Sequence, residues 1–451
     1  MPPTRFASSP VDASPLGRPL AFPFSGKAAP NRLLKAAMSE RLATWDAVNP
    51  ERRGVPTREL INVYRRWGEG GYGVILTGNF MLDYDQLEAP GNPIIPPGAP
   101  FEGERFDGFK GLAEAAKKEG SLVYAQVGHP GRQVSAAINP NPVSASDVQL
   151  EGRLMGSEYG KPRALEEKEI GEVVERFAFA AEYCYKAGYD GVQLHAAHGY
   201  LIAQFLSPTT NKRNDKYGGS LANRARFLLE IAAAIRSRVP DEGFSLGVKV
   251  NSVEFQDGGF STQDCAELCA ALEEAGFDWV ELSGGTYQEL GFSHRRESTR
   301  KREAFFLEFA EGIVPLLKKT KVYVTGGLRT VEAMAEALKS VDGVGIGRPV
   351  TDEFDLGKKL IGGEVAGAVR TLLPHDDFGV TGVSAGTQMK LVGEDREPLD
   401  LSREDHVAVF GASMGKWAKG MAENGDGSRF GYVDVEGVEL QPYGTPYAAA
   451  A

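Results

Sequence analysis

Short apolar runs rich in β-forming residues alternate along this chain with longer segments of helical periodicity. The apolar runs cover residues 32–38, 72–79, 122–127, 191–195, 245–251, 279–283, 322–326 and 343–347. The segments with helical spacing cover residues 57–67, 109–118, 170–186, 221–238, 262–275, 303–319 and 331–339. Near-continuous apolar strands that are joined by helices are typical of a parallel sheet buried on both faces. The pattern therefore predicts a succession of β/α units.

The number of strand-like runs, eight, is the number that closes a (β/α)8 TIM barrel. The main alternative is a doubly wound open sheet, which more often has about five or six strands and a glycine-rich first turn. The first run here continues as Ala36-Ala37-Met38-Ser39 and carries no G-x-G-x-x-G sequence. We therefore predict an α/β fold of the barrel type, with its chemistry at the carboxyl ends of the strands.

Three regions do not fit a minimal barrel, which we assign to residues 31–365. Residues 1–30 contain seven prolines and no apolar core of a secretory signal, so we predict an irregular N-terminal arm. Residues 130–163 are rich in Pro, Ser, Asn and Gly, and we expect them to form a lid-like insertion after strand 3. Residues 366–451 are expected to form a C-terminal extension that packs on the barrel or on a partner subunit, with an amphipathic segment near 403–423.

Composition narrows the classes of partner and compartment. The chain has 451 residues, 42% of them hydrophobic, and a formal net charge of −11. An acidic balance argues against nucleic acid or an anionic membrane as the main partner. No run approaches about 18 consecutive apolar residues, so no membrane span is expected. Cys184, Cys265 and Cys269 do not have the spacing of a disulfide framework or a metal site, which indicates a reduced, cytoplasmic setting.

Glycine-rich turns follow the seventh and eighth predicted strands. Gly326 and Gly327 follow strand 7, whereas Gly347 and Arg348 follow strand 8. Glycines let backbone N–H groups approach an anion, and each turn leads into a helix N-terminus. Arg348 can add a charge-assisted contact. One such loop could be a tight turn only, but two at the strands where barrels often bind phosphate favour a phosphate-bearing ligand.

Two histidines and a tyrosine lie within six residues at the end of the fourth strand. They are His195, His198 and Tyr200. Neutral histidines can donate hydrogen bonds to a developing oxyanion, and a protonated tyrosine can act as a general acid. The alternatives are a metal-binding pair or structural histidines. No carboxylate lies within the motif to complete a metal site, and three donors together favour a catalytic role.

Three other strands supply polar groups to the same face. Gln126 ends strand 3, Ser39 ends strand 1 and Lys249 lies in strand 5. A side-chain amide both donates and accepts, which suits a flat heterocycle with alternating N–H and C=O groups. Lys249 would place positive charge beside such a ring. Each residue is ordinary alone, and the prediction depends on their convergence.

Several motifs together carry a family resemblance. They are residues 31–39, Gln126, His195-x-x-His198-x-Tyr200, Gly345-x-Gly347-Arg348, and the run 211–220 with Asn223-Arg224 and Arg226-Phe227. Over roughly residues 18–365 the chain resembles the old yellow enzyme family of FMN-dependent ene-reductases. The resemblance implies a TIM barrel that binds one FMN non-covalently, accepts electrons from NAD(P)H and passes hydride to an activated alkene.

The resemblance also implies a role for each residue. His195 and His198 would hold the substrate carbonyl, and Tyr200 would donate the proton. The substrate would also meet Arg41 and Gly128. The residues implied to bind FMN are Ala36, Ala37, Met38, Ser39, Gly78, Gln126, Lys249, Gly326, Gly327, Gly347 and Arg348.

Five positions depart from the family pattern. Lys249 replaces an arginine beside flavin N1, and Ser39 replaces a cysteine or threonine. Arg41 stands at a tyrosine position of the bacterial-type branch, and Gly128 at a tryptophan position of yeast-type members, which should widen the pocket. Ala222 stands where a glutamate is usual. None of these changes removes a catalytic role, but Ser39, Arg41 and Gly128 leave the substrate preference open.

The sequence leaves two other functions open. One is a non-redox isomerase or cyclase on the same flavin barrel. The other is a barrel that binds flavin or phosphate ligands without turnover. In each case the expected partner is a small molecule, the choice between NADH and NADPH is open, and a homodimer is a candidate assembly.

Overall fold

Eight parallel strands close into a barrel in the computed structural model, which describes residues 2–152, 157–254, 256–284, 307 and 309–447. The strands are β3 (Leu33–Lys35), β4 (Val74–Met81), β5 (Leu122–Gly128), β8 (Gly191–Ala196), β9 (Ser245–Asn251), β10 (Trp279–Ser283), β11 (Lys321–Thr325) and β12 (Gly343–Ile346). Each strand pairs with the next in this order, and β12 pairs back to β3. The predicted barrel is confirmed. The first strand ends earlier than expected, because the backbone leaves the sheet after Lys35.

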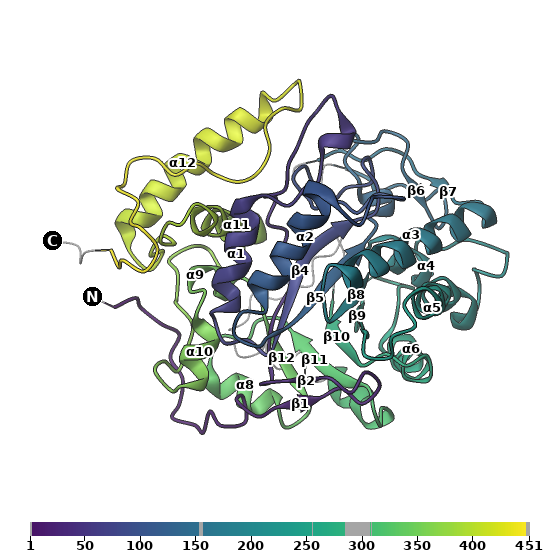
Figure 1. The fold of residues 1–451 in the computed structure, drawn as a ribbon, viewed down its shortest axis with the longest axis horizontal. Coiled ribbons are helices and arrows are strands. Elements are labelled where there is room, and N and C mark those ends of the chain that lie inside the picture. The colour runs from purple at the N-terminus through teal and green to yellow at the C-terminus, as the bar shows by residue number, and fades with distance from the viewer. Residues whose placement is uncertain (1, 153–156, 255, 285–306, 308, 448–451) are drawn as a thin grey trace.

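Helices surround the barrel (Figure 1). They are α1 (Arg58–Gly68), α2 (Gly103–Ala116), α3 (Glu167–Lys186), α4 (Leu201–Leu206), α5 (Leu221–Arg238), α6 (Thr262–Glu274), α8 (Val331–Ala337), α9 (Pro349–Asp352) and α10 (Leu356–Ile361). Four of them begin at a Ser or Thr whose side chain accepts from a backbone N–H three residues on, which stabilises the helix start. Part of the helix expected at 303–319 lies outside the described residues. Residues 309–313 are helical, and the short turn η3 (Val314–Leu316) follows them.

Side chains that alternate along the strands fill the barrel in layers. The lowest layer is aromatic, and its ring centroids lie 5.1 Å apart for Tyr124 and Trp279 and 5.7 Å apart for Trp279 and Tyr323. Because successive residues of a strand point to opposite faces, the next inward positions lie two residues further on. Those positions are Gln126 on β5 and Glu281 on β10, so the interior changes from apolar to polar toward the carboxyl ends.

The N-terminal arm covers the amino-terminal end of the barrel. Its strands β1 (Leu20–Ala21) and β2 (Ala28–Ala29) form an antiparallel hairpin. Phe22 is buried beneath the barrel, with its ring centroid 6.4 Å from that of Tyr124. In Figure 1 this hairpin lies at the bottom of the molecule, away from α12 (Glu404–Ala422). The arm therefore does not cover the carboxyl ends of the strands, where the functional residues are expected.

The insertion after β5 packs on α4. It contains η2 (Gly131–Gln133) and β6 (Val143–Ser144), which pairs with β7 (Arg163–Ala164). Ser144 Oγ donates to Gln204 Oε1 over 2.8 Å, and Gln204 Nε2 donates to the carbonyl of Pro130 over 3.0 Å. These buried hydrogen bonds anchor the insertion to the barrel.

The C-terminal extension contains two long helices. Helix α12 corresponds to the amphipathic segment expected near 403–423. Helix α11 (Phe378–Gly393) is an element that the sequence analysis missed, and it lies against α1 and α9. Its central residues are buried on most sides and are mainly small or apolar. A helix without one narrow apolar stripe shows no clear 3.6-residue pattern, which explains why it was missed.

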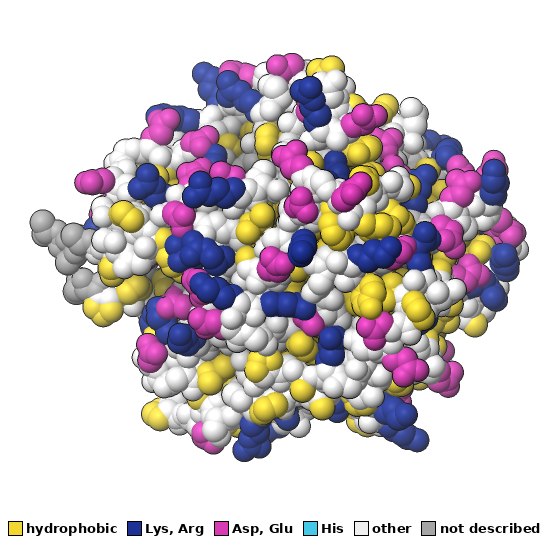
Figure 2. Space-filling view, viewed as in Figure 1, with side chains coloured by type: hydrophobic (Ala, Val, Ile, Leu, Met, Phe, Trp, Pro, Cys, Tyr) yellow, Lys and Arg dark blue, Asp and Glu magenta, His cyan; other side chains and the backbone are white. Residues whose placement is uncertain are grey.

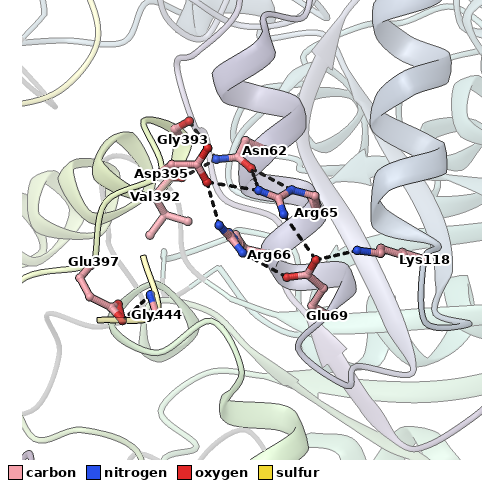
Figure 3. Close-up of polar contacts among 10 residues, drawn as sticks. All are labelled: Asn62, Arg65, Arg66, Glu69, Lys118, Val392, Gly393, Asp395, Glu397 and Gly444. Carbon is pink, nitrogen blue, oxygen red and sulfur yellow. Dashed lines mark hydrogen bonds and ion pairs between the residues drawn. The ribbon is translucent and has the colours of Figure 1, made fainter. Parts of the chain in front are cut away.

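A polar cluster fastens α1 to the end of α11 (Figure 3). Asn62 Nδ2 donates to the carbonyls of Val392 and Gly393 over 2.9 and 3.1 Å. Asp395 Oδ1 accepts from Arg65 and Arg66 over 3.2 and 2.7 Å. Since the last carbonyls of a helix have no partner within it, the buried Asn62 amide caps α11.

Replacing Asn62 with alanine is expected to lower the free energy of unfolding by about 1–3 kcal/mol, because the Gly393 carbonyl loses the amide donor and the Val392 carbonyl is left with the backbone N–H of Asp395. The matched control is Lys118→Ala in the same cluster. Its exposed amine pairs with Glu69 over 3.0 Å, and such surface pairs contribute only about 0–1 kcal/mol. Denaturant unfolding of both variants measures the difference. Equal losses would contradict the capping role.

The surface mixes charges of both signs. On the face shown in Figure 2, Lys and Arg side chains are interspersed with Asp and Glu side chains. None of the helices in the described part of the chain has the length and apolar character needed to cross a membrane. The three cysteines are unpaired and buried.

Candidate active site

A cavity of about 520 Å³ opens where the carboxyl ends of the strands meet the C-terminal extension. Its volume falls within the range of roughly 300–1,000 Å³ that is usual for ligand pockets. Fourteen of the sixteen predicted site residues line it: Ala36, Ala37, Met38, Ser39, Arg41, Gln126, His195, His198, Tyr200, Lys249, Gly326, Gly327, Gly347 and Arg348. The structure thus brings together residues that the sequence spreads over more than 300 positions.

A chain of hydrogen bonds joins the two histidines at the cavity wall. His195 Nδ1 lies 2.9 Å from Asn79 Oδ1, and His195 Nε2 lies 3.3 Å from His198 Nδ1. At the far end, His198 Nε2 lies 2.9 Å from Ser283 Oγ. Each neutral imidazole has one donor and one acceptor nitrogen, so the neighbours of the pair determine which nitrogen carries hydrogen.

Both imidazoles are neutral near pH 7. Burial and, to a smaller extent, the positive charge of Lys249 together lower the pKa of His198 to about 3. Burial, followed by His198 and Lys249, lowers the pKa of His195 well below 6.5. A neutral imidazole in a water-poor site can donate one directed hydrogen bond to a ligand oxygen.

A β-bulge brings Asn79 to the histidines. Leu76 pairs with Tyr124 and Asn79 with Gln126, so β4 carries one residue more than β5 between these two pairs. An extra residue changes which side chains of a strand face inward. It directs Asn79 into the barrel, where its Nδ2 also approaches Ser39 Oγ at 3.5 Å. A simple alternation of strand residues does not reveal this, and the sequence analysis missed Asn79.

Tyr200 stands beside the histidines at the start of α4. It is buried, and its ring centroid lies 4.2 Å from that of His195. The backbone N–H of Gln204 donates to the Tyr200 carbonyl, so the helix fixes the tyrosine backbone. The phenol and the two imidazoles therefore belong to one rigid turn and the helix that follows it.

A second buried chain connects Gln126 with Lys249. Gln126 Nε2 donates to Gln193 Oε1, and Gln193 Nε2 donates to Glu281 Oε2, each over 2.6 Å. The other carboxylate oxygen, Glu281 Oε1, lies 2.9 Å from Lys249 Nζ. Gln193 and Glu281 were missed because inward polar residues of buried strands stand within runs that are otherwise apolar.

The turns after β11 and β12 offer backbone to the cavity. Gly326 and Gly327 have φ values of 145° and 78°, which disfavour other residue types. A side chain at Gly347 would meet no atom within 4 Å, so its absence leaves cavity space beside the backbone. Thr325 also lines the cavity, whereas its hydroxyl is buried beside Gly345 of the adjacent strand. These features fit a ligand with anionic oxygens.

Arg348 connects this turn to the C-terminal extension. Its guanidinium donates to Thr381 Oγ1 of α11 and lies 5.5 Å from the ring centroid of Phe378. Thr381 and Phe378 come from the extension, so the extension orients the cation at this end of the cavity.

Arg41 lies in the outer wall between an acidic and an aromatic neighbour. Its guanidinium is 3.2 Å from Glu88 Oε1 and 5.0 Å from the ring centroid of Tyr432. Tyr432 Oη donates to the carbonyl of Ser39 over 2.9 Å. The end of the chain thus holds both Arg41 and the Ser39 backbone. Glu88 and Tyr432 were missed because nothing near them in sequence marks a site.

Gly78 and Gly128 are the two predicted site residues that do not line the cavity. Gly78 lies behind the wall, where its N–H donates to Glu40 Oε1 over 2.9 Å. Gly128 packs on the side chain of His195, which an added Cβ would meet at 3.3 Å, so it does not widen the cavity.

No described residue of the insertion 130–163 lines the cavity, and the lid role expected of it is not supported. The C-terminal extension forms the outer wall instead, through residues that include Phe378, Val383, Trp417 and Tyr432. No cluster among the described residues could hold a metal ion.

Comparisons with known proteins agree with this arrangement. A family model described as the NADH:flavin oxidoreductase / NADH oxidase family matches residues 25–363. The NADH-dependent flavin oxidoreductase nadA of Aspergillus parasiticus is 49% identical over 415 residues, which cover 92% of this chain and 93% of the relative. That coverage continues past residue 363, so this relative shares the C-terminal extension at least in part. The NADH-dependent flavin oxidoreductase iccE of Talaromyces variabilis is 35% identical over 345 residues, or 72% of this chain and 81% of the relative.

Solved structures match the fold. Morphinone reductase has a TM-score of 0.63 and 24% identity, over 79% of this chain and 91% of its own. An old yellow enzyme homologue from Zymomonas mobilis also has a TM-score of 0.63 and 24% identity, over 80% of this chain and 98% of its own. At this level of identity the likeness establishes the barrel architecture.

Proposed function

Because the chain belongs to the NADH:flavin oxidoreductase / NADH oxidase family, among the old yellow enzymes, we propose that it is an ene-reductase. Its family uses FMN with a nicotinamide reductant. The proposed reaction uses NADH to reduce the C=C bond of an α,β-unsaturated carbonyl compound. NADH is the first choice of reductant because the names of both fungal relatives specify it. The observation that carries the proposal is the meeting of His195, His198 and Tyr200 in one cavity with Gln126 and Lys249.

The residues of the cavity fit FMN. The open backbone at Gly347 and the glycines Gly326 and Gly327 suit a phosphate, with Arg348 as the charged partner. Gln126 and Lys249 at the barrel centre suit the polar edge of a flat heterocycle, and the apolar Met38 lies in the same wall. When bound, FMN supplies two-electron hydride transfer between NADH and the alkene.

The histidines orient and polarise the substrate. A ring N–H aimed at the carbonyl oxygen draws electron density from the conjugated C=C bond, which favours hydride addition at the β-carbon. Asn79 can present either its oxygen or its NH2 to His195 Nδ1. Only the NH2 leaves hydrogen on Nε2, where it can face a ligand. Asn79 Oδ1 is the atom that faces His195 Nδ1, so the productive tautomer requires the amide to be turned over, and Asn79 controls which tautomer His195 adopts.

Tyr200 completes the addition by supplying a proton to the α-carbon. A tyrosine phenol is one of the side-chain groups that act as general acids in enzymes. The buried ring beside His195 places this proton at the substrate cavity. General acids of this kind typically contribute about 10²–10⁴ in rate.

The decisive experiment is anaerobic and optical. Yellow purified protein should be bleached by NADH and then recoloured by 2-cyclohexen-1-one, with one product formed per flavin. A protein without bound flavin would refute the proposal. Flavin that is bleached but not recoloured by any of a panel of enones would refute the alkene substrate. Product formation from an enone isomer without consumption of NADH would favour an isomerase.

Arg348→Ala is expected to weaken FMN binding about tenfold or more, because a charge-assisted hydrogen bond is worth roughly 1.5–3 kcal/mol. The dissociation constant is measured from the quenching of flavin fluorescence by apoprotein. Arg403→Ala is the matched control, since Arg403 pairs with Asp405 over 2.6 Å and does not line the cavity. Unchanged retention of FMN by the Arg348 variant would show that another group holds the phosphate.

A further inference from the structure

Glu281 is a carboxylate that lies outside the cavity wall, where it contacts Lys249 directly and is connected to Gln126 through Gln193. Its side chain is 0% exposed, and that of Lys249 is 6% exposed. The two residues are register partners on β10 and β9. Burying a carboxylate is costly unless it is paired and hydrogen-bonded, and both oxygens of Glu281 have such partners. The sequence analysis gave this residue no role.

The first consequence concerns the direction of the amide chain. A carboxylate only accepts hydrogen bonds, so Gln193 must turn its NH2 toward Glu281 and its oxygen toward Gln126. Gln126 must then turn its own NH2 toward Gln193. This leaves the Gln126 carbonyl oxygen as the acceptor available at the cavity. The charge of Glu281 therefore determines, through two amides, what Gln126 presents to a ligand.

The second consequence concerns charge at the cavity. The ammonium of Lys249 lines the wall, and the Glu281 carboxylate lies 2.9 Å behind it. In a buried region of low dielectric constant the field of one charge is cancelled strongly by an opposite charge so near. Lys35 also interacts with Glu281, and burial lowers its pKa to about 7, so it is only partly charged near neutral pH. Glu281 thus weakens the attraction that Lys249 exerts on negative charge in the cavity.

We propose that Glu281 is a positioning residue that lowers the reduction potential of bound FMN and fixes the orientation of Gln126. The inference rests on the proposed function, because it requires FMN in this cavity. Reduction of a flavin adds negative charge to its ring, so a less positive wall favours the oxidised form. A lower reduction potential makes the protein-bound reduced flavin a stronger hydride donor to the alkene.

The test is a set of potentials measured on FMN-loaded protein by equilibration with reference dyes. Glu281→Gln keeps the shape and removes the charge. It is expected to increase the affinity for reduced relative to oxidised FMN by tenfold or more, which is a rise of about 30 mV for a two-electron couple. Lys249→Met is expected to lower the potential. The double variant should lie between the two single variants.

Gln193→Leu separates the two consequences. Gln193 carries no charge, so its loss should leave the potential near that of the parent protein while weakening FMN binding through a disordered Gln126. The double variant also covers the case in which Glu281→Gln alone does not fold, because it leaves no unpaired buried charge. Its potential should then exceed that of Lys249→Met.

Two results would overturn the inference. The first is a Glu281→Gln potential equal to or below that of the parent. The second is a double variant with the same potential as Lys249→Met. Either result in protein that binds FMN and reduces enones would leave the proposed function intact. Failure of the parent protein to bind FMN would refute the proposed function itself.

Discussion

Tyr200→Phe should slow the reoxidation of reduced enzyme by an enone about 10²–10⁴-fold, the usual range for loss of a general acid. Reduction by NADH should stay close to the parental rate, because that step needs no proton from Tyr200. The buried ring packs 4.2 Å from His195, and phenylalanine preserves this packing. Stopped-flow absorbance under anaerobic conditions resolves the two steps.

Slower reoxidation together with an unchanged rate of reduction would identify Tyr200 as the proton donor. If both steps slow equally, the ring has a structural role, and phenylalanine has disturbed the site. If reoxidation keeps the parental rate, water or another residue supplies the proton. Tyr217→Phe is a suitable control, because Tyr217 is also a buried tyrosine but donates to Glu230 over 2.8 Å and does not line the cavity.

Replacing His195 and His198 together with alanine should weaken the binding of a phenol ligand and cut enone reduction by about 10²-fold or more. Two neutral and buried hydrogen-bond donors are then lost from the cavity wall. His198→Asn is the informative companion, since an amide keeps an N–H donor and should retain much of the activity. Binding is followed by the change in the flavin spectrum, and turnover by NADH consumption.

The pH dependence gives an independent check of the histidine charges. Because the pKa of His198 is lowered to about 3 and that of His195 is also lowered, neither ring should gain a proton between pH 6 and 8. Phenol affinity should therefore show no histidine titration in this range in the parent protein. A rise in affinity as the pH falls through 6.5, absent from the double variant, would mean that a charged imidazole holds the ligand.

The strands and their ends could be predicted because the barrel imposes a simple pattern. Each buried strand is an apolar run, and residues just past its carboxyl end face one shared site. That rule found His195, Gln126 and Gly347 without knowledge of their contacts. The roles assigned to these residues stay predictions until variants are measured.

Residues whose position depends on a local irregularity or on distant packing could not be predicted. Asn79 faces inward because β4 has one extra residue, and a bulge leaves no clear mark in the hydrophobic pattern. Glu281 stands in an apolar run and acts through a partner on the adjacent strand. Tyr432 reaches Ser39 across 393 positions, which no spacing rule anticipates. These are properties of the folded chain and not of any segment.

The position of the outer wall at the end of the chain has a consequence for biosynthesis. A ribosome makes the chain from its N-terminus, and domains generally begin to fold in that order. The last barrel strand ends at Ile346, whereas Trp417 and Tyr432 are added much later. During that interval the nascent barrel has its strands but lacks its cover. FMN can therefore be loaded from the open side while the polypeptide is still attached to the ribosome, before the extension closes over it.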